Sequence, residues 1–588
     1  MKRISRRAFL RRSAALTLGS GAFLLSSCNG LLPGQKPTII PATNDPTALP
    51  VTPTAASPQT APGVGNEFVP DVEINLAARQ SQAQILPGSL TNVWTYQGTL
   101  VKGSSENLQT LQDSFLGPII RVRKGQKVRV RFTHDLPEPS IIHWHGLLVP
   151  SRMDGHPRDA IQSGQTYVYD FEVVNRAGTY WYHPHPEPFT GGQVIRGLAG
   201  LFLISDDEEA AAGLPSGEFD IPLVIQDRTF DENNQIVYVD GGSMPGMEGM
   251  ESAPSMEMLM GFLGERILVN GHETPLLPVA TRAYRLRLLN GSNSRVYKLG
   301  WSNGAPMTVI ATDGGLLESP VQRPFVMLGP GERIELWADF SQTPVGTEIV
   351  LASQPFLGAE GDSLVEGGAG MGEGMGHGNM PGMGSSQTPE AGAGGGMEDY
   401  NPKLPNGAGF PVLHVRVDRQ EQETLSLPAK LSTIQRYAVE QVVNAQQPRR
   451  FGLTMRNSTW LINGRAFKLE DVAEDEVVKL NTIEAWDFIN EQNPNETMEK
   501  MGMVHPMHIH GVQFQVIDRQ MLAPALKAGW DSVQEGYVDE GWKDTVLVMP
   551  GEGVRVLVRF DFPDLFLFHC HNLEHEDLGM MRNYRADP

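Results

Sequence analysis

Cysteine is nearly absent from this chain of 588 residues and occurs only at Cys28 and Cys570. Because Cys28 is predicted to belong to an export signal, no pair remains for an intrachain disulfide. Stabilisation by disulfides is therefore excluded, and Cys570 is predicted to be a lone thiol. Its immediate neighbours are His569 and His571, which is the first indication of a metal site.

An excess of positive charge is also lacking, since the chain has 47 Lys and Arg against 68 Asp and Glu, and a formal net charge of −21. An acidic surface of this size repels nucleic-acid phosphates and anionic lipid headgroups. Binding to nucleic acid is therefore excluded as a function. The same charge attracts metal cations, although acidic surfaces are more commonly only solubilising.

The apolar run from Ala14 to Leu25 is too short to span a bilayer as a stable helix. It follows the twin-arginine pattern Ser5-Arg6-Arg7-Ala8-Phe9-Leu10, so residues 1–27 are predicted to be a signal for the twin-arginine export machinery. Leu25-Ser26-Ser27-Cys28 resembles a bacterial lipobox and predicts a lipid anchor at Cys28, with simple cleavage past Cys28 as the alternative. We expect an exported protein, periplasmic or on the outer face of the cell membrane, with residues 28–66 as a Pro- and Thr-rich tether.

No long helical periodicity competes with the strand pattern of this sequence. Apolar and polar residues alternate in 127–132 and in 554–560, and Asn-Gly turns stand at 270–271 and 463–464. Three similar turns precede alternating strands: Arg123-Lys124-Gly125-Gln126, Gly329-Pro330-Gly331-Glu332 and Met549-Pro550-Gly551-Glu552. This internal repeat predicts an all-β protein with three Greek-key β-sandwich domains, at 67–206, 207–357 and 405–588.

Eleven of the 24 methionines lie in two segments without core periodicity, 244–260 and the Gly-rich segment 358–404. Thioether sulfur suits Cu(I), so we interpret these segments as copper-handling rather than as flexible filler. His377, within the second segment, is a further candidate for such a role.

Ten of the fifteen histidines fall into four short clusters: His143-Trp144-His145, His183-Pro184-His185, His505-Pro506-Met507-His508-Ile509-His510, and His569-Cys570-His571 with His575. A single His-x-His arises readily by chance, whereas four in one chain indicate a metal. Residues two apart on a strand point to the same face, with Cα atoms roughly 6.5–7 Å apart, so both imidazoles can converge on one cluster. Eight imidazoles suffice for three metal ions with positions left for O2, although imidazole suits copper, zinc and iron alike. The remaining histidines are interpreted as structural or surface residues: His134, His156, His272 and His414.

The last cluster identifies the metal. On a strand, His569 and His571 face one way and the Cys570 thiolate faces the other. A thiolate, two imidazoles and a thioether form the ligand set of a blue-copper electron-transfer site, which Cys570, His505, His575 and Met580 supply. Because Cys570 is covalently joined to both histidines, an electron that arrives at its copper has a short bonded route to the metal cluster.

These motifs resemble those of the multicopper oxidase family, in particular bacterial laccases and copper-efflux oxidases. The resemblance implies three cupredoxin-like domains and four copper ions: one type 1, one type 2 and two type 3. By motif, the type 1 ligands would be His505, Cys570, His575 and Met580, the type 2 ligands His143 and His508, and the type 3 ligands His145, His183, His185, His510, His569 and His571. It also implies that Asp154, near the type 2 copper, and Glu576, near the type 3 pair, relay the protons that reduction of O2 to water consumes.

The implied activity is one-electron oxidation of a donor coupled to reduction of O2, with phenols, aromatic amines and Cu(I) as candidate donors and a monomer as the expected state. Residues 569–581 are most similar to copper-efflux oxidases, and Met503 resembles one of their Cu(I)-site methionines. Met501 stands where those enzymes would have an acid, so broad laccase activity stays open. Two alternatives belong to other classes: a copper nitrite reductase, which needs no eight-histidine cluster, and a non-enzymatic copper-sequestering surface protein.

Overall fold

The computed structural model describes residues 68–238, 254–359, 402–490 and 502–588. These ranges belong to one compact unit, Pro58–Pro588. The predicted signal, the tether and Cys28 lie outside the described residues, as do 244–253 of the first Met segment and 360–401 of the second. No helix in the described ranges is long and apolar enough to cross a membrane.

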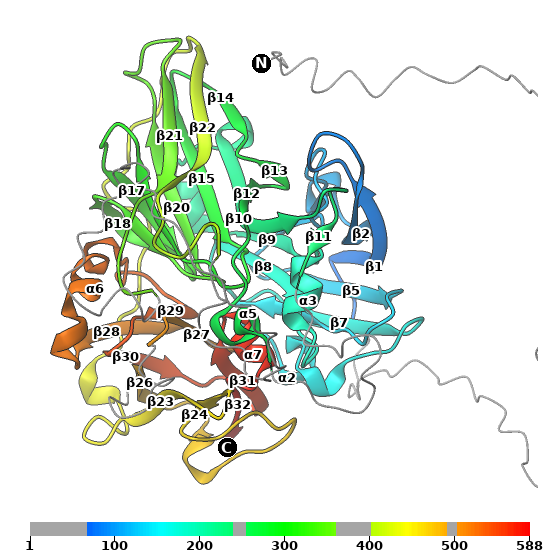
Figure 1. Ribbon diagram of the computed structural model, residues 1–588, viewed down its shortest axis with the longest axis vertical. Helices are drawn as coiled ribbons and strands as arrows, with labels where there is room; N and C mark the ends of the chain where they lie inside the picture. Colours follow the sequence, from blue (N-terminus) through cyan, green and yellow to red (C-terminus); the bar gives the residue numbers. More distant parts are fainter. Residues whose placement is uncertain (1–67, 239–253, 360–401, 491–501) are drawn as a thin grey trace, which may run out of the picture. The chain divides into compact units, whose positions relative to one another are not determined.

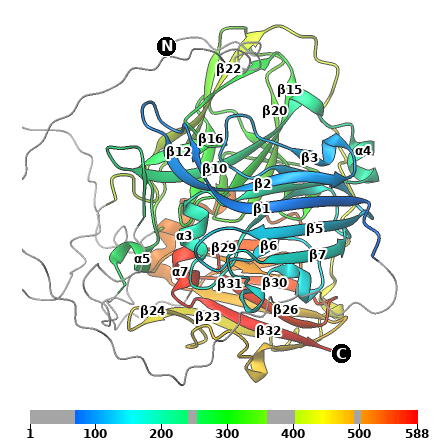
Figure 2. The same cartoon turned by 90° about the vertical axis from the view of Figure 1, so that its right-hand side faces the viewer.

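The first of three β-sandwiches is drawn in blue to cyan in Figure 1. Figure 2 shows the strands of its first sheet side by side, in the order β2 (Thr91–Lys102), β1 (Val72–Ala83), β5 (Lys127–His134) and β7 (Thr166–Glu172). Its second sheet has the order β3 (Leu108–Gln109), β4 (Ile119–Arg123), β9 (Gly200–Ser205), β8 (Gly178–Pro184) and β6 (Ile142–His145). Val128, Val130 and Phe132 of β5 are fully buried in the core between the sheets, as their alternation predicts. Burial of each such side chain stabilises the fold by about 1.5–3 kcal/mol.

The second sandwich, green to yellow-green in Figure 1, has the largest sheet among the described residues. That sheet has the order β13 (His272–Glu273), β12 (Arg266–Val269), β10 (Asp220–Phe230), β15 (Ala283–Asn290), β20 (Arg333–Asp339), β17 (Met307–Thr312) and β18 (Gly315–Arg323), with β11 (Ile236–Val237) on β10. The opposing sheet has the order β14 (Leu276–Ala280), β22 (Phe410–Arg419), β21 (Glu348–Ser353), β16 (Tyr297–Trp301) and β19 (Val326–Leu328).

Strand β22 lies in a different sandwich from the one that the predicted domain boundaries give it. The sequence places it in the third unit, 405–588, but its hydrogen bonds are to β14 and β21 of the second sandwich. Val412, Val415 and Val417 of this strand are buried in the second core. The third sandwich therefore begins later than residue 405, because an alternating strand pattern does not reveal which sheet the strand joins.

The third sandwich, yellow to red in Figure 1, consists of two five-stranded sheets. One has the order β24 (Thr459–Ile462), β23 (Arg449–Arg456), β26 (Ile483–Asn490), β30 (Glu552–Arg559) and β28 (Phe514–Met521). The other has the order β25 (Val477–Lys479), β32 (Met581–Asp587), β31 (Asp564–Cys570), β27 (His505–Ile509) and β29 (Thr545–Val548). The described helices are short: α2 (Ser151–Asp154), α3 (Thr190–Ile195), α4 (Asp207–Ala212), α5 (Met256–Met260), α6 (Lys527–Asp531) and α7 (Leu573–Asp577).

The repeated turns predicted from the sequence have the same conformation in all three sandwiches. Their glycines have left-handed backbone angles, with φ of 88° at Gly125, 83° at Gly331 and 73° at Gly551. In each turn the fourth residue donates its backbone N–H to the carbonyl of the first, over 3.1, 3.0 and 3.0 Å respectively. Its side chain also accepts the N–H of the first residue, over 2.7, 2.6 and 2.8 Å. Gly is required at the third position because side chains disfavour positive φ. The internal repeat is thus confirmed at the level of the backbone.

Candidate metal centre

The four His-x-His pairs lie on strands, or directly at the ends of strands, of the first and third sandwiches. His143 and His145 are on β6, with His183 directly opposite His143 on β8, and His508 on β27 is opposite His569 on β31. The other members of the pairs, His185, His510 and His571, follow the ends of their strands. All eight side chains are fully buried. The strand pairing thus gathers four imidazoles from each sandwich.

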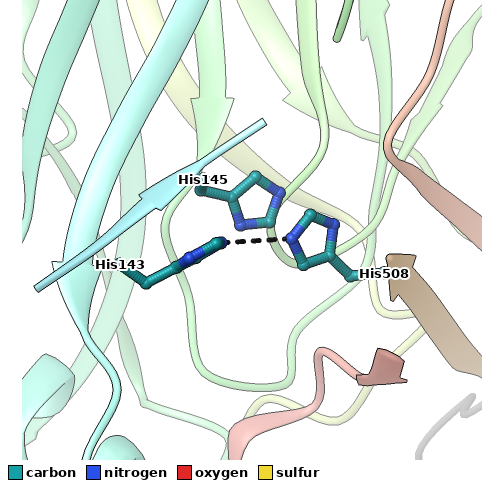
Figure 3. A group of neighbouring side chains, drawn as sticks. All are labelled: His143, His145 and His508. Atoms are coloured by element: carbon teal, nitrogen blue, oxygen red, sulfur yellow. Dashed lines mark hydrogen bonds between the residues drawn. The ribbon is translucent and has the colours of Figure 1, made fainter. Parts of the chain in front are cut away.

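The structure brings these eight imidazoles together in groups that could each hold one metal ion. His145, His183 and His571 form one triad, and a second triad consists of His185, His510 and His569. Within each group the ligand atoms lie within 4.8 Å of one another. His143 and His508 meet between the sandwiches, with 3.3 Å between their Nε2 atoms, and His145 adjoins them (Figure 3). The predicted six type 3 histidines thus divide into two triads, and the predicted type 2 pair faces across the interface.

The protonation and bonding of these histidines fit a bound metal. Burial, and then repulsion from neighbouring imidazoles, lowers the pKa of His145, His183 and His571 far below the usual range, which favours the neutral, ligating form. Several ring nitrogens are buried without a hydrogen-bond partner, namely His145 Nδ1, His183 Nε2 and both nitrogens of His571. An unsatisfied buried polar atom costs about 1–3 kcal/mol, so a metal ion would relieve this cost.

A second, separate group surrounds Cys570 in the third sandwich. Its Sγ lies 3.4 Å from His505 Nδ1 and 3.7 Å from His575 Nδ1. Met580 is fully buried, and its carbonyl accepts the Cys570 N–H over 3.0 Å. The indole of Trp460 covers the group, with its ring centroid 4.2 Å from that of His575.

The electrostatics of this group also fit a metal. Burial lowers the pKa of His505 to about 3, which keeps that imidazole neutral. Burial also raises the pKa of the Cys570 thiol, so the thiolate would form only with a cation beside it. A soft thiolate with two neutral imidazoles suits copper.

The two predicted relay acids lie against histidines of the eight-imidazole group. Asp154, at the end of α2, places Oδ2 at 2.8 Å from His510 Nδ1 and Oδ1 at 3.5 Å from His143 Nδ1. Glu576 on α7 lies 3.0 Å from His569 Nδ1 and 3.5 Å from His185 Nε2. Burial acts to raise the pKa of Glu576, but the electrostatic effect of His185 and His569 outweighs burial and lowers this pKa. Asp154 therefore bridges the predicted type 2 pair and one triad, and Glu576 contacts that triad alone.

Sequence reasoning missed Asp544 and Thr545, which contact imidazoles other than the two that Asp154 contacts. Asp544 Oδ1 lies 3.1 Å from His145 Nε2, and its carbonyl is 2.7 Å from His508 Nδ1. The hydroxyl of Thr545 is 3.0 Å from His145 Nε2. No motif signals these residues, because they lie far along the chain from His145 and gain their role only through packing.

Glu574 was also missed. It is fully buried on α7, where Tyr238 and Asn293 donate to it over 2.9 and 2.7 Å and the Phe262 N–H over 3.0 Å. Of the predicted methionines, Met503 is buried, and three others lie on α5, which contacts α7: Met256, Met258 and Met260. The other methionines of the two segments, and Met501, lie outside the described residues.

Together, the sandwich fold and the two histidine-rich groups define a copper-dependent oxidoreductase, and the comparisons with known proteins agree. Residues 92–209 and 442–588 match the sequence profiles of the multicopper oxidase family. The chain is 30% identical to a laccase from Bacillus stratosphericus over 529 residues, which covers 84% of this chain and 90% of the laccase. It is 31% identical to the bilirubin oxidase of Albifimbria verrucaria, over 80% of this chain and 71% of that enzyme.

A solved structure extends the likeness to the whole fold. The McoA multicopper oxidase of Aquifex aeolicus aligns with a TM-score of 0.67 and 31% identity, covering 89% of this chain and 97% of that one. The chain belongs to the multicopper oxidase family. The cupredoxin-like sandwich fold expected from the sequence is confirmed, and the comparisons support neither a nitrite reductase nor a copper-sequestering protein.

Proposed function

We propose that this oxidase binds four copper ions, three at the eight imidazoles and one at the group around Cys570. His505, Cys570, His575 and Met580 would hold the type 1 copper, and His143 and His508 the type 2 copper. The two histidine triads would hold the type 3 pair. When bound, copper supplies the redox chemistry: one-electron oxidation of a donor at the type 1 site and four-electron reduction of O2 to water at the other three ions.

One observation carries this proposal. Three consecutive residues, His569, Cys570 and His571, belong to three different ligand groups, with Cys570 in the mononuclear group and one histidine in each triad. Each histidine is one peptide bond from Cys570, so the backbone provides a short covalent path between the sites. A protein that only stored copper would have no need of such a path.

The chain's own acids would handle the protons. Reduction of O2 to water consumes four protons, and the eight imidazoles are buried away from bulk water. Asp154 at His510 and Glu576 at His569 hold carboxylates within hydrogen-bonding distance of imidazoles from the cluster. We assign them the role of relays that deliver protons to the site.

Both the relatives and the sequence support a proposal for the electron donor. Relatives include a laccase and a bilirubin oxidase, and a multicopper oxidase from Campylobacter jejuni, with 25% identity and a TM-score of 0.62, is described as a metallo-oxidase. We propose phenols, aromatic amines or Cu(I) as donors for this chain. The buried Met503, two residues before His505 in the chain, and the methionines of α5, which contacts α7, favour a route for Cu(I).

O2 uptake by the copper-loaded protein, with Cu(I) and with a phenol, tests this function. We expect four coppers per chain and turnover with at least one donor; binding of copper without O2 uptake would contradict the proposal.

Deletion of 358–404 should abolish oxidation of Cu(I) but not of the phenol. The matched control keeps the segment and replaces its five methionines by Leu, namely Met371, Met375, Met380, Met383 and Met397. Equal effects on both donors would contradict a role in Cu(I) delivery.

We further propose export of the folded protein by the twin-arginine machinery and a lipid anchor at Cys28, with a monomer as the mature form outside the cytoplasm. The basis is the sequence of residues 5–28. Mass spectrometry of the mature protein should find a lipid-modified Cys28 at its N-terminus. A mature chain that begins after residue 28 would exclude the anchor, and light scattering would reveal any dimer.

A further inference from the structure

None of the metal-binding groups among the described residues includes a side chain from the second sandwich. We nevertheless propose that this sandwich fixes the geometry of the three-copper site through Gly331, in the turn before β20, and Arg333, the first residue of β20. Gly331 would allow the turn before β20 to lie directly on two imidazoles. Arg333 would hold the carboxylate that orients two others. This inference rests on the proposed function, because it concerns the copper site assigned there.

The repeated turn shows why Gly331 is special. At Gly125, in the first sandwich, an added Cβ would meet nothing within 4 Å. At Gly331 it would lie 3.0 Å from His571 Cδ2 and 3.1 Å from His145 Cε1. Both imidazoles belong to the same triad. The same backbone turn thus faces open space in one sandwich and forms a wall of the proposed copper site in another.

Every N–H group of the Arg333 guanidinium takes part in a hydrogen bond. It is completely buried, and its guanidinium donates to Asp544 through two bonds of 2.7 and 2.6 Å. Its other N–H groups donate to the carbonyls of Thr179, Gly331 and Asp313 over 2.9, 2.9 and 3.1 Å. All five donors of the planar fork are therefore satisfied, and the side chain has a single possible position.

This clamp reaches the imidazoles through Asp544. The carboxylate that Arg333 holds lies 3.1 Å from His145 Nε2, and the carbonyl of Asp544 lies 2.7 Å from His508 Nδ1. Partners of metal-bound histidines set ring orientation, and their loss typically reduces metal affinity or activity by about 10–100-fold. Arg333 is accordingly a positioning residue, one step removed from the ligands.

A second buried cation, Lys543, shares Asp313 with Arg333 and must be distinguished from it. Lys543 lies 3.1 Å from Asp313 and 3.1 Å from Glu332, and Asp313 accepts the backbone N–H of Arg333 over 2.8 Å. Lys543 thus pairs with Asp313 and Glu332, whereas Arg333 binds Asp544, the carboxylate that contacts His145. The bidentate geometry at Asp544 is what a lysine cannot reproduce, so Arg333→Lys separates geometry from charge.

The first experiment compares Gly331→Ala with Gly125→Ala in copper-loaded protein. Both variants place a methyl group on the same strained turn, so both should lose similar stability from the backbone. Because His145 also adjoins the type 2 pair His143 and His508, we expect only Gly331→Ala to change the electron paramagnetic resonance spectrum of the type 2 copper and to lower the copper content. Its O2 uptake should fall by roughly 10–100-fold, because changes in the surroundings of metal ligands typically reduce activity by that factor. Identical spectra and copper contents for the two variants would overturn the proposal.

The second experiment uses Arg333→Met and Arg333→Lys, with Arg295→Met as control. Arg295 is equally buried and donates to Asp227, Gly264 and Leu404 over 2.8, 2.8 and 2.7 Å, and none of these residues belongs to a metal-binding group. We expect Arg333→Met to alter the type 2 spectrum while the blue absorption of the Cys570 site persists. In Arg333→Lys the type 2 spectrum should return only partly to that of the wild type. Arg295→Met should lose stability with an unchanged spectrum. If Arg333→Met does not fold, the Lys variant decides, and a wild-type spectrum there would overturn the proposal.

The wild-type protein separates this inference from the function on which it rests. If the wild type bound no copper or consumed no O2, the proposed function would fail. If it did both and the Gly331 and Arg333 variants matched their controls in spectrum and copper content, only the role of the second sandwich would fail.

Discussion

The two proposed copper sites are built in different ways. The mononuclear group takes His505, Cys570, His575 and Met580 from the third sandwich alone, whereas the eight imidazoles come in equal numbers from the first and third sandwiches. The ligands of the mononuclear group are brought together by the folding of one sandwich, and the eight imidazoles are brought together by the packing of two. This difference predicts that each site can be damaged without the other, and four substitutions test that independence.

Cys570→Ser should have the largest effect. It removes the single thiolate of the mononuclear group, so the blue absorption should vanish and donor oxidation should fall by far more than the roughly 100-fold loss typical of an outer partner. Copper analysis should show one ion fewer per chain. Blue protein with normal turnover would show that Cys570 is not a ligand.

His143→Ala should have the opposite signature. His143 faces His508 at 3.3 Å across the interface, so its loss should reduce O2 uptake by about 100-fold or more while the blue absorption stays. His156→Gln is the matched control, because His156 is also fully buried but bonds Asn583 over 2.9 Å and belongs to no metal group. If the control lost as much activity as His143→Ala, burial rather than ligation would explain the result.

Asp154→Asn should slow turnover less, by about 10–100-fold, because it keeps the shape of a group that supports ligands but removes its capacity to carry a proton. Stopped-flow mixing with O2 should show slower reoxidation with an unchanged rate of reduction by the donor. Asp561→Asn, at an exposed position between β30 and β31, serves as control. Unchanged reoxidation in Asp154→Asn would remove this acid from the proton path.

Trp460→Phe should have the smallest effect. It keeps an aromatic ring over His575 but loses the bond from Nε1 to the Leu259 carbonyl, which is 3.0 Å long, at a cost of about 1 kcal/mol in the free energy of unfolding. Thermal unfolding should detect that loss, and the blue absorption should shift slightly. A changed type 2 spectrum would contradict the independence of the two sites.

Much of this molecule can be predicted from its sequence where the signal is local. The His-x-His pairs, the turns at Gly125, Gly331 and Gly551, and the strand at 127–132 all depend on residues a few positions apart. Their chemistry or backbone angles leave few alternatives.

The rest depends on packing between distant segments. Arg333 and Asp544 carry no spacing signal, since an arginine or aspartate at a strand end is ordinary until the fold brings it to an imidazole. The residue pattern of 410–419 predicts a strand but is compatible with any sheet, so its partner strands could not be predicted. Asp154 was expected from resemblance alone, because an Asp-Gly pair otherwise suggests an exposed turn.

The contact between Leu259 and Trp460 has a consequence for recombination among relatives. In the chain, α5 belongs with the second sandwich, yet it packs on α7, which carries His575, and the Phe262 N–H binds Glu574 over 3.0 Å. A chimera that exchanged only the C-terminal sandwich would therefore place the native α5 against a foreign α7 and a foreign Cys570 group. Transplanting residues 255–263 together with that sandwich should yield the better-matched hybrid.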